Sequence, residues 1–88
     1  MNAANGLNAV LYPNPATDKA TVKFNATDAG SYTLKLYDLV GQSMLSIDGS
    51  AVQGENMVEL NLASVAKGVY TLSVISNGNT EQIRVVVE

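Results

Sequence analysis

The apolar residues of this 88-residue chain come in short runs that alternate with polar residues and stop at turn-forming residues. The run from Ala20 to Asn25 shows the pattern: Ala20, Val22 and Phe24 share one side of an extended chain. Turn signals separate such runs at intervals of roughly 8 to 12 residues, which is the spacing of an antiparallel β-sandwich. No window holds a convincing helical period. The sequence therefore predicts an all-β fold, an immunoglobulin-like β-sandwich of about seven antiparallel strands.

The other strands are expected at about 8–12, 32–37, 42–47, 58–62, 70–74 and 80–87. Their predicted inward side chains are Tyr32, Leu34, Leu36, Val58, Leu60, Leu62, Tyr70, Leu72, Val74, Ile83, Val85 and Val87. The run from Gln42 to Ile47 has no clear phase, because Met44, Leu45 and Ile47 do not fit one face.

Glycine, proline and asparagine mark the expected turns. Two prolines flank Asn14 and end the first strand. The segments 48–50 (Asp-Gly-Ser) and 53–56 (Gln-Gly-Glu-Asn) predict two turns in the middle of the chain. Asn77-Gly78 favours a two-residue type I′ hairpin turn before the last strand.

Lys67, Gly68 and Tyr70 resemble the corner that leads into a late strand of an immunoglobulin-like sandwich. We expect Gly68 to supply a backbone angle that other residues resist. Tyr70 has an apolar body and a hydroxyl group that needs a partner when it is buried. The hydroxyl is expected to donate a hydrogen bond to the backbone just upstream, as tyrosines do at such corners.

Composition limits the function classes. Eighty-eight residues make one domain, and 47% hydrophobic residues are too many for a disordered chain. The chain has no Cys or His, so disulfides, thiol catalysis and the common nucleophile–base pairs are missing, and we expect no enzyme, cofactor or metal. A net charge of −3 with five scattered basic residues argues against nucleic acid and anionic membranes as partners.

A few residues suggest binding chemistry, each with a simpler structural explanation. Asp18, Asp28, Asp38 and Asp48 recur every ten residues, which suggests a carboxylate pair or a calcium site, but turns recruit Asp for their own hydrogen bonds. Asn25-Ala26-Thr27 fits the short N-glycosylation triplet. The tyrosines could form a stacking platform for sugars, for which Tyr37 is expected to be the exposed one and Tyr12 is undecided.

The last strand is the strongest candidate for recognition. Its segment is Ile83, Arg84, Val85, Val86, Val87 and Glu88. A strand at a sheet edge offers unpaired N–H and C=O groups that another chain can extend, either a partner or a second copy in a weak homodimer. The alternative is that this strand merely completes the sheet.

Three ordered blocks carry a resemblance to a known family. The first is Leu11 with Tyr12, Pro13, Asn14 and Pro15. The second runs from Leu36 through Asp38 to Gly41, and the third leads from Leu60 through Lys67, Gly68 and Tyr70 to the valine-rich terminal strand. In this order and spacing, residues 10–88 resemble the type A C-terminal sorting domain of type IX secretion (the Por secretion system) of Bacteroidetes.

The resemblance implies a signal domain at the end of a larger exported protein. Such a domain directs its cargo from the periplasm to an outer-membrane translocon, and a sortase-like signal peptidase then removes it at the cell surface. Residues 83–88 would be the segment that the machinery needs, and the three blocks would supply structural turns. Residues 1–7 would be a linker or lead-in that holds the cleavage region upstream of Leu11, and residues 8–88 the sorting domain.

Two positions depart from the family pattern. The chain ends in Glu88, where many members end in a basic residue, and Val65 stands where Leu is common. The alternative function, from another class, is an immunoglobulin-like adhesion or carbohydrate-binding module of a surface protein. The same fold serves both functions, so the site must decide between them.

Overall fold

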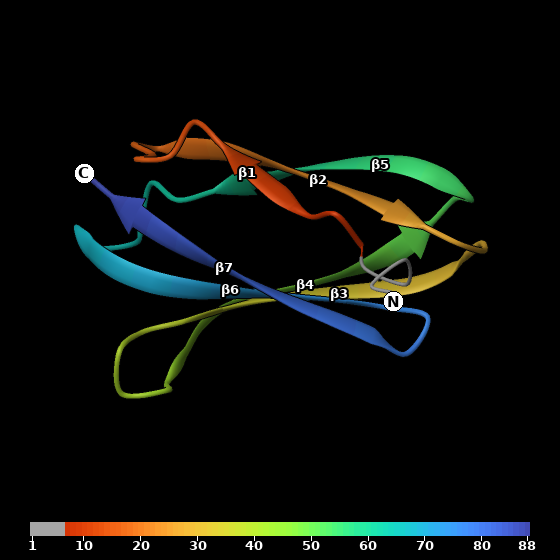
Figure 1. Cartoon of the computed structure of the whole chain (residues 1–88). Helices are drawn as coiled ribbons and strands as arrows, with labels where there is room; N and C mark the ends of the chain where they lie inside the picture. Colours follow the sequence, from red (N-terminus) through yellow and green to blue (C-terminus); the bar gives the residue numbers. More distant parts are fainter. Residues whose placement is uncertain (1–6) are drawn as a thin grey trace.

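The computed structural model describes residues 7–88, and the expected lead-in over residues 1–6 lies outside this range. Seven strands follow one another in this part of the chain (Figure 1). They are β1 (Val10–Tyr12), β2 (Lys19–Ala26), β3 (Gly30–Tyr37), β4 (Ser43–Ala51), β5 (Gly54–Asn61), β6 (Gly68–Ser76) and β7 (Asn79–Val87). Residues 7–88 contain no helix, and hence none that is long and apolar enough to cross a membrane.

The strands form two packed sheets, which confirms the predicted β-sandwich. One sheet has the order β1-β2-β5 and the other the order β4-β3-β6-β7. Every strand pair is antiparallel. The strand β6 pairs with β3 on one side and with β7 on the other, so the last hairpin of the chain is joined to the β3–β4 hairpin in one sheet.

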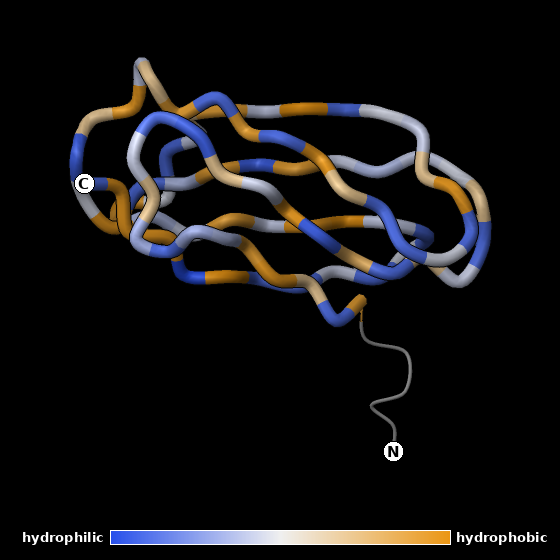
Figure 2. The backbone as a smooth tube through the Cα atoms, turned by 90° about the horizontal axis from the view of Figure 1, so that it is seen from above, coloured by the Kyte–Doolittle hydropathy of each residue, from blue (hydrophilic) through white to orange (hydrophobic). Residues whose placement is uncertain are grey.

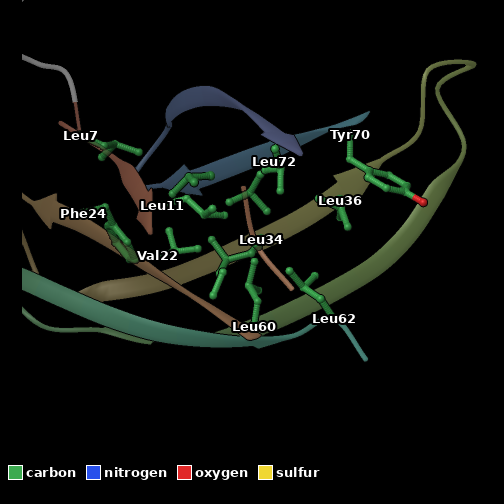
Figure 3. Packing of buried hydrophobic residues seen from close by; sticks show 14 of the residues in the cluster. Leu7, Leu11, Val22, Phe24, Leu34, Leu36, Leu60, Leu62, Tyr70 and Leu72 are labelled. Atoms are coloured by element: carbon green, nitrogen blue, oxygen red, sulfur yellow. The ribbon is translucent and has the colours of Figure 1, made fainter. Parts of the chain in front are cut away.

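The core lies between the sheets (Figure 3). Apolar and polar residues alternate along the strands as predicted (Figure 2). Phe24, Leu34, Leu36, Leu60 and Leu72 are fully buried. Tyr32 is only half-buried, with its ring packed edge-on against Phe24 at a centroid distance of 5.6 Å. In β4, Leu45 and Ile47 face the core, which resolves the unclear phase of that run.

The turn predicted at Asp48-Gly49-Ser50 is wrong, because these residues lie inside β4. Gly49 pairs with Tyr32 of β3, and a Cβ atom on Gly49 would overlap the Tyr32 ring. The glycine therefore makes room for an aromatic side chain of the neighbouring strand. The chain turns later, at Val52 and Gln53, where the Asn56 side chain bonds to the backbone N–H and C=O of Val52. Of the second predicted turn, Gly54, Glu55 and Asn56 already belong to β5.

The hairpin between β6 and β7 has the predicted geometry. Asn77 and Gly78 both have positive φ, at 51° and 78°, and Ser76 pairs with Asn79 across the turn. Two positive φ angles in a two-residue loop define a type I′ turn, whose twist matches that of the strands.

The chain segment before β1 is part of the packed domain. Leu7 is 1% exposed and belongs to the core cluster. The backbone N–H groups of Leu7 and Ala9 donate to the Glu81 carboxylate of β7, at 3.1 and 2.7 Å. The packed domain therefore includes Leu7, one residue before the expected boundary.

Candidate functional site

The edge of β7 is covered along its second half by the segment that follows β1. The Asn14 side chain donates to the carbonyl of Arg84 at 2.8 Å and accepts from the N–H of Val86 at 3.1 Å. Ala16, which is fully buried, donates its N–H to the carbonyl of Val86 and accepts from the N–H of Glu88. The sequence left open whether the valine-rich end offers a free edge, and here a segment of the same chain already fills it.

This arrangement gives the proline turn a structural task. Pro13 and Pro15 hold Asn14 between them in a turn that ends β1. A proline has a fixed φ and no N–H, so the two prolines restrict the segment while its remaining polar groups bond to β7. In Figure 1 the turn after β1 lies at the same end of the sandwich as the C-terminus.

The residues of the terminal strand divide between core and surface. Val85 and Val87 are buried, Ile83 and Val86 are half-buried, and Arg84 and Glu88 are exposed. Arg84 and Glu88, together with the exposed parts of Ile83 and Val86, can therefore meet a partner without unfolding the strand.

The tyrosine corner is present at the start of β6. The Tyr70 hydroxyl donates to the carbonyl of Ala66 at 2.6 Å, four residues upstream. Gly68 pairs with Val87, so the corner supports the end of the terminal strand directly. The expected special conformation of Gly68 is wrong, because its φ lies outside the left-handed region and an added Cβ would make only ordinary contact with Tyr70 at 3.6 Å. Lys67 lies in the loop just before Gly68.

The turn between β3 and β4 displays two apolar side chains. The Asp38 carboxylate accepts the N–H groups of Val40 and Gln42, and Gly41 closes the turn with a φ of 87°. These bonds fix the turn while leaving Leu39 78% and Val40 86% exposed. The two neighbouring side chains form a small exposed apolar patch, and exposed apolar patches often mark interaction sites.

The three sequence blocks meet at one end of the sandwich. A shallow hollow of about 290 Å³ joins the Asp38–Val40 turn to Gly68 and Tyr70. A second hollow of about 260 Å³ is lined by Asp18, Leu62, Lys67, Val87 and Glu88 among others. Motif residues that are far apart in the sequence thus surround the end of the terminal strand.

Four residues that contact the terminal strand or project beside it were not predicted from the sequence. Ala16 and Glu81 act through contacts with partners far away in the sequence, for which no local pattern gives a signal. Leu39 and Val40 did carry a signal, since two large apolar residues stand within a predicted turn, where side chains point to solvent.

The features of a sugar- or metal-binding site are sparse. Of the four tyrosines, Tyr12 is the exposed one, and its hydroxyl contacts the sulfur of Met57 at 3.6 Å. Tyr37, expected to be exposed, is half-buried. Within residues 7–88, no three His, Cys, Asp or Glu side chains lie close enough together to share a metal ion. Asp48 lies in a strand and accepts from the Thr33 hydroxyl, at 2.8 Å.

Comparison with protein families identifies the family of the chain. Residues 10–88 match the family model described as the secretion system C-terminal sorting domain. The chain belongs to this family. A C-terminal sorting domain of the Por, or type IX, secretion system is a non-catalytic secretion signal. The protein that carries it is exported, and the domain interacts with the secretion machinery.

Proposed function

We propose that this sorting domain directs its cargo through the outer-membrane type IX translocon and is afterwards removed by a sortase-like peptidase. The observation that carries the proposal is the double hydrogen bond of Asn14 to Arg84 and Val86. It joins the first family block to the terminal strand, so the motif residues hold the segment that the machinery reads.

The recognition surface we propose is the exposed part of the terminal strand together with the turn beside it. Its members are Arg84, Val86 and Glu88 of the last segment and Leu39 and Val40 of the turn. A groove of about 370 Å³ connects the two parts, with Leu39 at one side and Arg84 at the other. Such a surface combines an apolar projection with one cation and one carboxylate, which suits a partner with an apolar pocket and charged groups of both signs beside it.

Removal of the domain requires an accessible backbone upstream of the packed part. Because Leu7 is buried and its N–H is bonded to Glu81, we place the cleavage region before Leu7. Proteases cut segments that leave the packed structure more readily than segments within it.

The test uses a reporter with a signal peptide fused to residues 1–88, in a host that has this secretion system. We expect the full fusion on the surface or in the medium and a fusion without residues 7–88 in the periplasm. If both fusions left the cell equally, the domain would not be a sorting signal.

Deleting residues 83–88 would not test recognition, because Val85 and Val87 are buried and the deletion would unfold the domain. Substitutions of exposed residues test recognition without unfolding the domain. Arg84→Glu with Glu88→Lys, and Leu39→Ser with Val40→Ser, should keep the fold and retain the reporter in the periplasm. The matched control is Val52→Ser, an exposed apolar residue between β4 and β5. Normal export of both surface variants would reject this recognition surface.

The adhesion or carbohydrate-binding module is the second candidate. It shares the fold, and the exposed Tyr12 beside Met57 is the feature that supports it. Binding of the isolated domain to a glycan array, lost on Tyr12→Ala, would favour it over a purely sorting role.

A further inference from the structure

The edge strands β4, β5 and β7 differ in how they are protected. Asn14 and Ala16 fill the edge of β7 along its second half, at the backbone groups of Arg84, Val86 and Glu88. In the first half of β7, Leu7 and Ala9 bond to the Glu81 side chain. The edge strand β5 carries Glu55 and Glu59, four residues apart on one face, and charges discourage pairing with another strand. The edge strand β4 spans nine residues, has no proline and no lysine, and has one charged residue, Asp48.

The β6–β7 turn fixes which backbone groups of β4 are free. Ser76 and Asn79 flank a two-residue turn and therefore form a hydrogen-bonded pair. Such pairs recur at every second residue, and successive residues of a central strand bond to opposite neighbours. This alternation can be followed from β6 to β3 and from β3 to β4 through their residue pairing. It shows that the backbone N–H and C=O groups of Leu45, Ile47 and Gly49 point toward β3.

The backbone N–H and C=O groups of Ser46, Asp48 and Ser50 consequently point away from the sheet. The same reasoning predicts that the backbone groups of Val86 in β7 point outward, and they do bond outward to Asn14 and Ala16. Within residues 7–88, no group bonds to the backbone N–H or C=O of these three β4 residues. They lie about 7 Å apart along the strand, which is the repeat that an added strand would match.

The side chains around this edge define the sequence of a fitting strand. Leu45, Ile47 and Val58 are half-buried and pack against the core where the two sheets open. Alternate side chains of an added strand would cover them and should be apolar. On the outer face, the added strand would run beside the Asp48 carboxylate, so a lysine or arginine belongs there.

We propose that the β4 edge binds an extended segment of another protein by strand addition, with alternating apolar residues and a cation beside Asp48. A second copy of this chain fits less well. The antiparallel pairing of two β4 strands that uses all three free residues places Asp48 opposite Asp48, and like charges directly opposite are destabilising. The proposal does not depend on the role of residues 83–88.

The probe is an acetylated nine-residue peptide in which valine alternates with threonine and the central threonine is replaced by lysine. Its control has glutamate at the centre. We expect the lysine peptide to slow hydrogen exchange at the amides of Ser46, Asp48 and Ser50, as followed by NMR on the whole chain. Protection at β5 or β7 instead, or none anywhere, would overturn the proposal.

Two variants separate the backbone from the charge. Ser46→Pro with Ser50→Pro removes two outward N–H donors without touching the bonds to β3, and should weaken binding about tenfold or more. Asp48→Lys should invert the preference in favour of the glutamate peptide. An unchanged preference would refute the predicted register, and exchange protection that grows with protein concentration alone would identify a second copy as the occupant and overturn the proposal.

Discussion

The side chain of Asn14 replaces a neighbouring strand beside Val86. Its amide accepts the Val86 N–H and donates to the Arg84 carbonyl, which are the two backbone groups that a paired strand would satisfy between these residues. The segment that follows the first strand thereby protects the edge of the last one. We call this contact between Asn14 and β7 the seam of the sandwich, and it forms without a continuous strand pair.

Replacing Asn14 should loosen this seam. Asn14→Ala removes both hydrogen bonds, and at about 0.5 to 1.5 kcal/mol for each neutral bond we expect a loss of about 1 to 3 kcal/mol in unfolding free energy. Urea denaturation measures the loss, and the Val86 amide should exchange faster in the variant. Asn25→Ala is the control, because Asn25 is exposed in β2 and its side chain has no hydrogen bond within residues 7–88. Equal effects of the two substitutions would contradict the bridging role.

The Tyr70 hydroxyl should contribute measurably to stability. Tyr70→Phe keeps the ring in the core but leaves the Ala66 carbonyl without its 2.6 Å partner, which should cost about 1 to 2 kcal/mol. Tyr37→Phe is the matched control, since the Tyr37 hydroxyl has no partner within residues 7–88. Denaturation midpoints at an unchanged m-value report the difference. A Tyr70→Phe variant as stable as the parent would show that the corner is held by packing alone.

The Glu81 carboxylate should anchor the start of the domain. Glu81→Gln keeps one acceptor oxygen for two N–H donors, so the bond to either Leu7 or Ala9 must weaken. Bonds to a charged acceptor contribute about 1.5 to 3 kcal/mol, and we expect a loss near the lower value because the site is half-buried. Faster exchange at the Leu7 and Ala9 amides should accompany it. Glu59→Gln, exposed on β5, should change neither the stability nor those amides.

The sequence predicted correctly those features that depend on interactions between residues close together in the chain. Alternation over a few residues identified the inward faces of β2, β3, β6 and β7, and the Asn77-Gly78 pair identified a turn whose φ angles those residues tolerate. The tyrosine corner was predictable for the same reason, because its hydrogen bond spans only four residues.

The predictions were wrong or incomplete where contacts between residues far apart in the chain determine the structure. The Asn14 bond to Val86 joins residues 72 positions apart, so the sequence near β7 could not show that its edge is covered. Asp48-Gly49-Ser50 has the composition of a turn, but the β3 pairing and the Tyr32 ring hold it extended. Tertiary contacts outweigh a local preference of this size.

Gly49 and Gly68 should respond in opposite ways to alanine. At Gly49 a Cβ would overlap the Tyr32 ring, and forcing the two apart should cost about 1 to 3 kcal/mol. At Gly68 the added Cβ meets Tyr70 at an ordinary distance and φ is not left-handed, so Gly68→Ala should be neutral or stabilise by up to about 1 kcal/mol. Thermal and urea unfolding of both variants measure the contrast. In a Tyr32→Ala background the penalty at Gly49 should largely vanish, because the ring that opposes the Cβ is gone. A penalty that persisted there would show that β4 itself, and not the ring, requires the glycine.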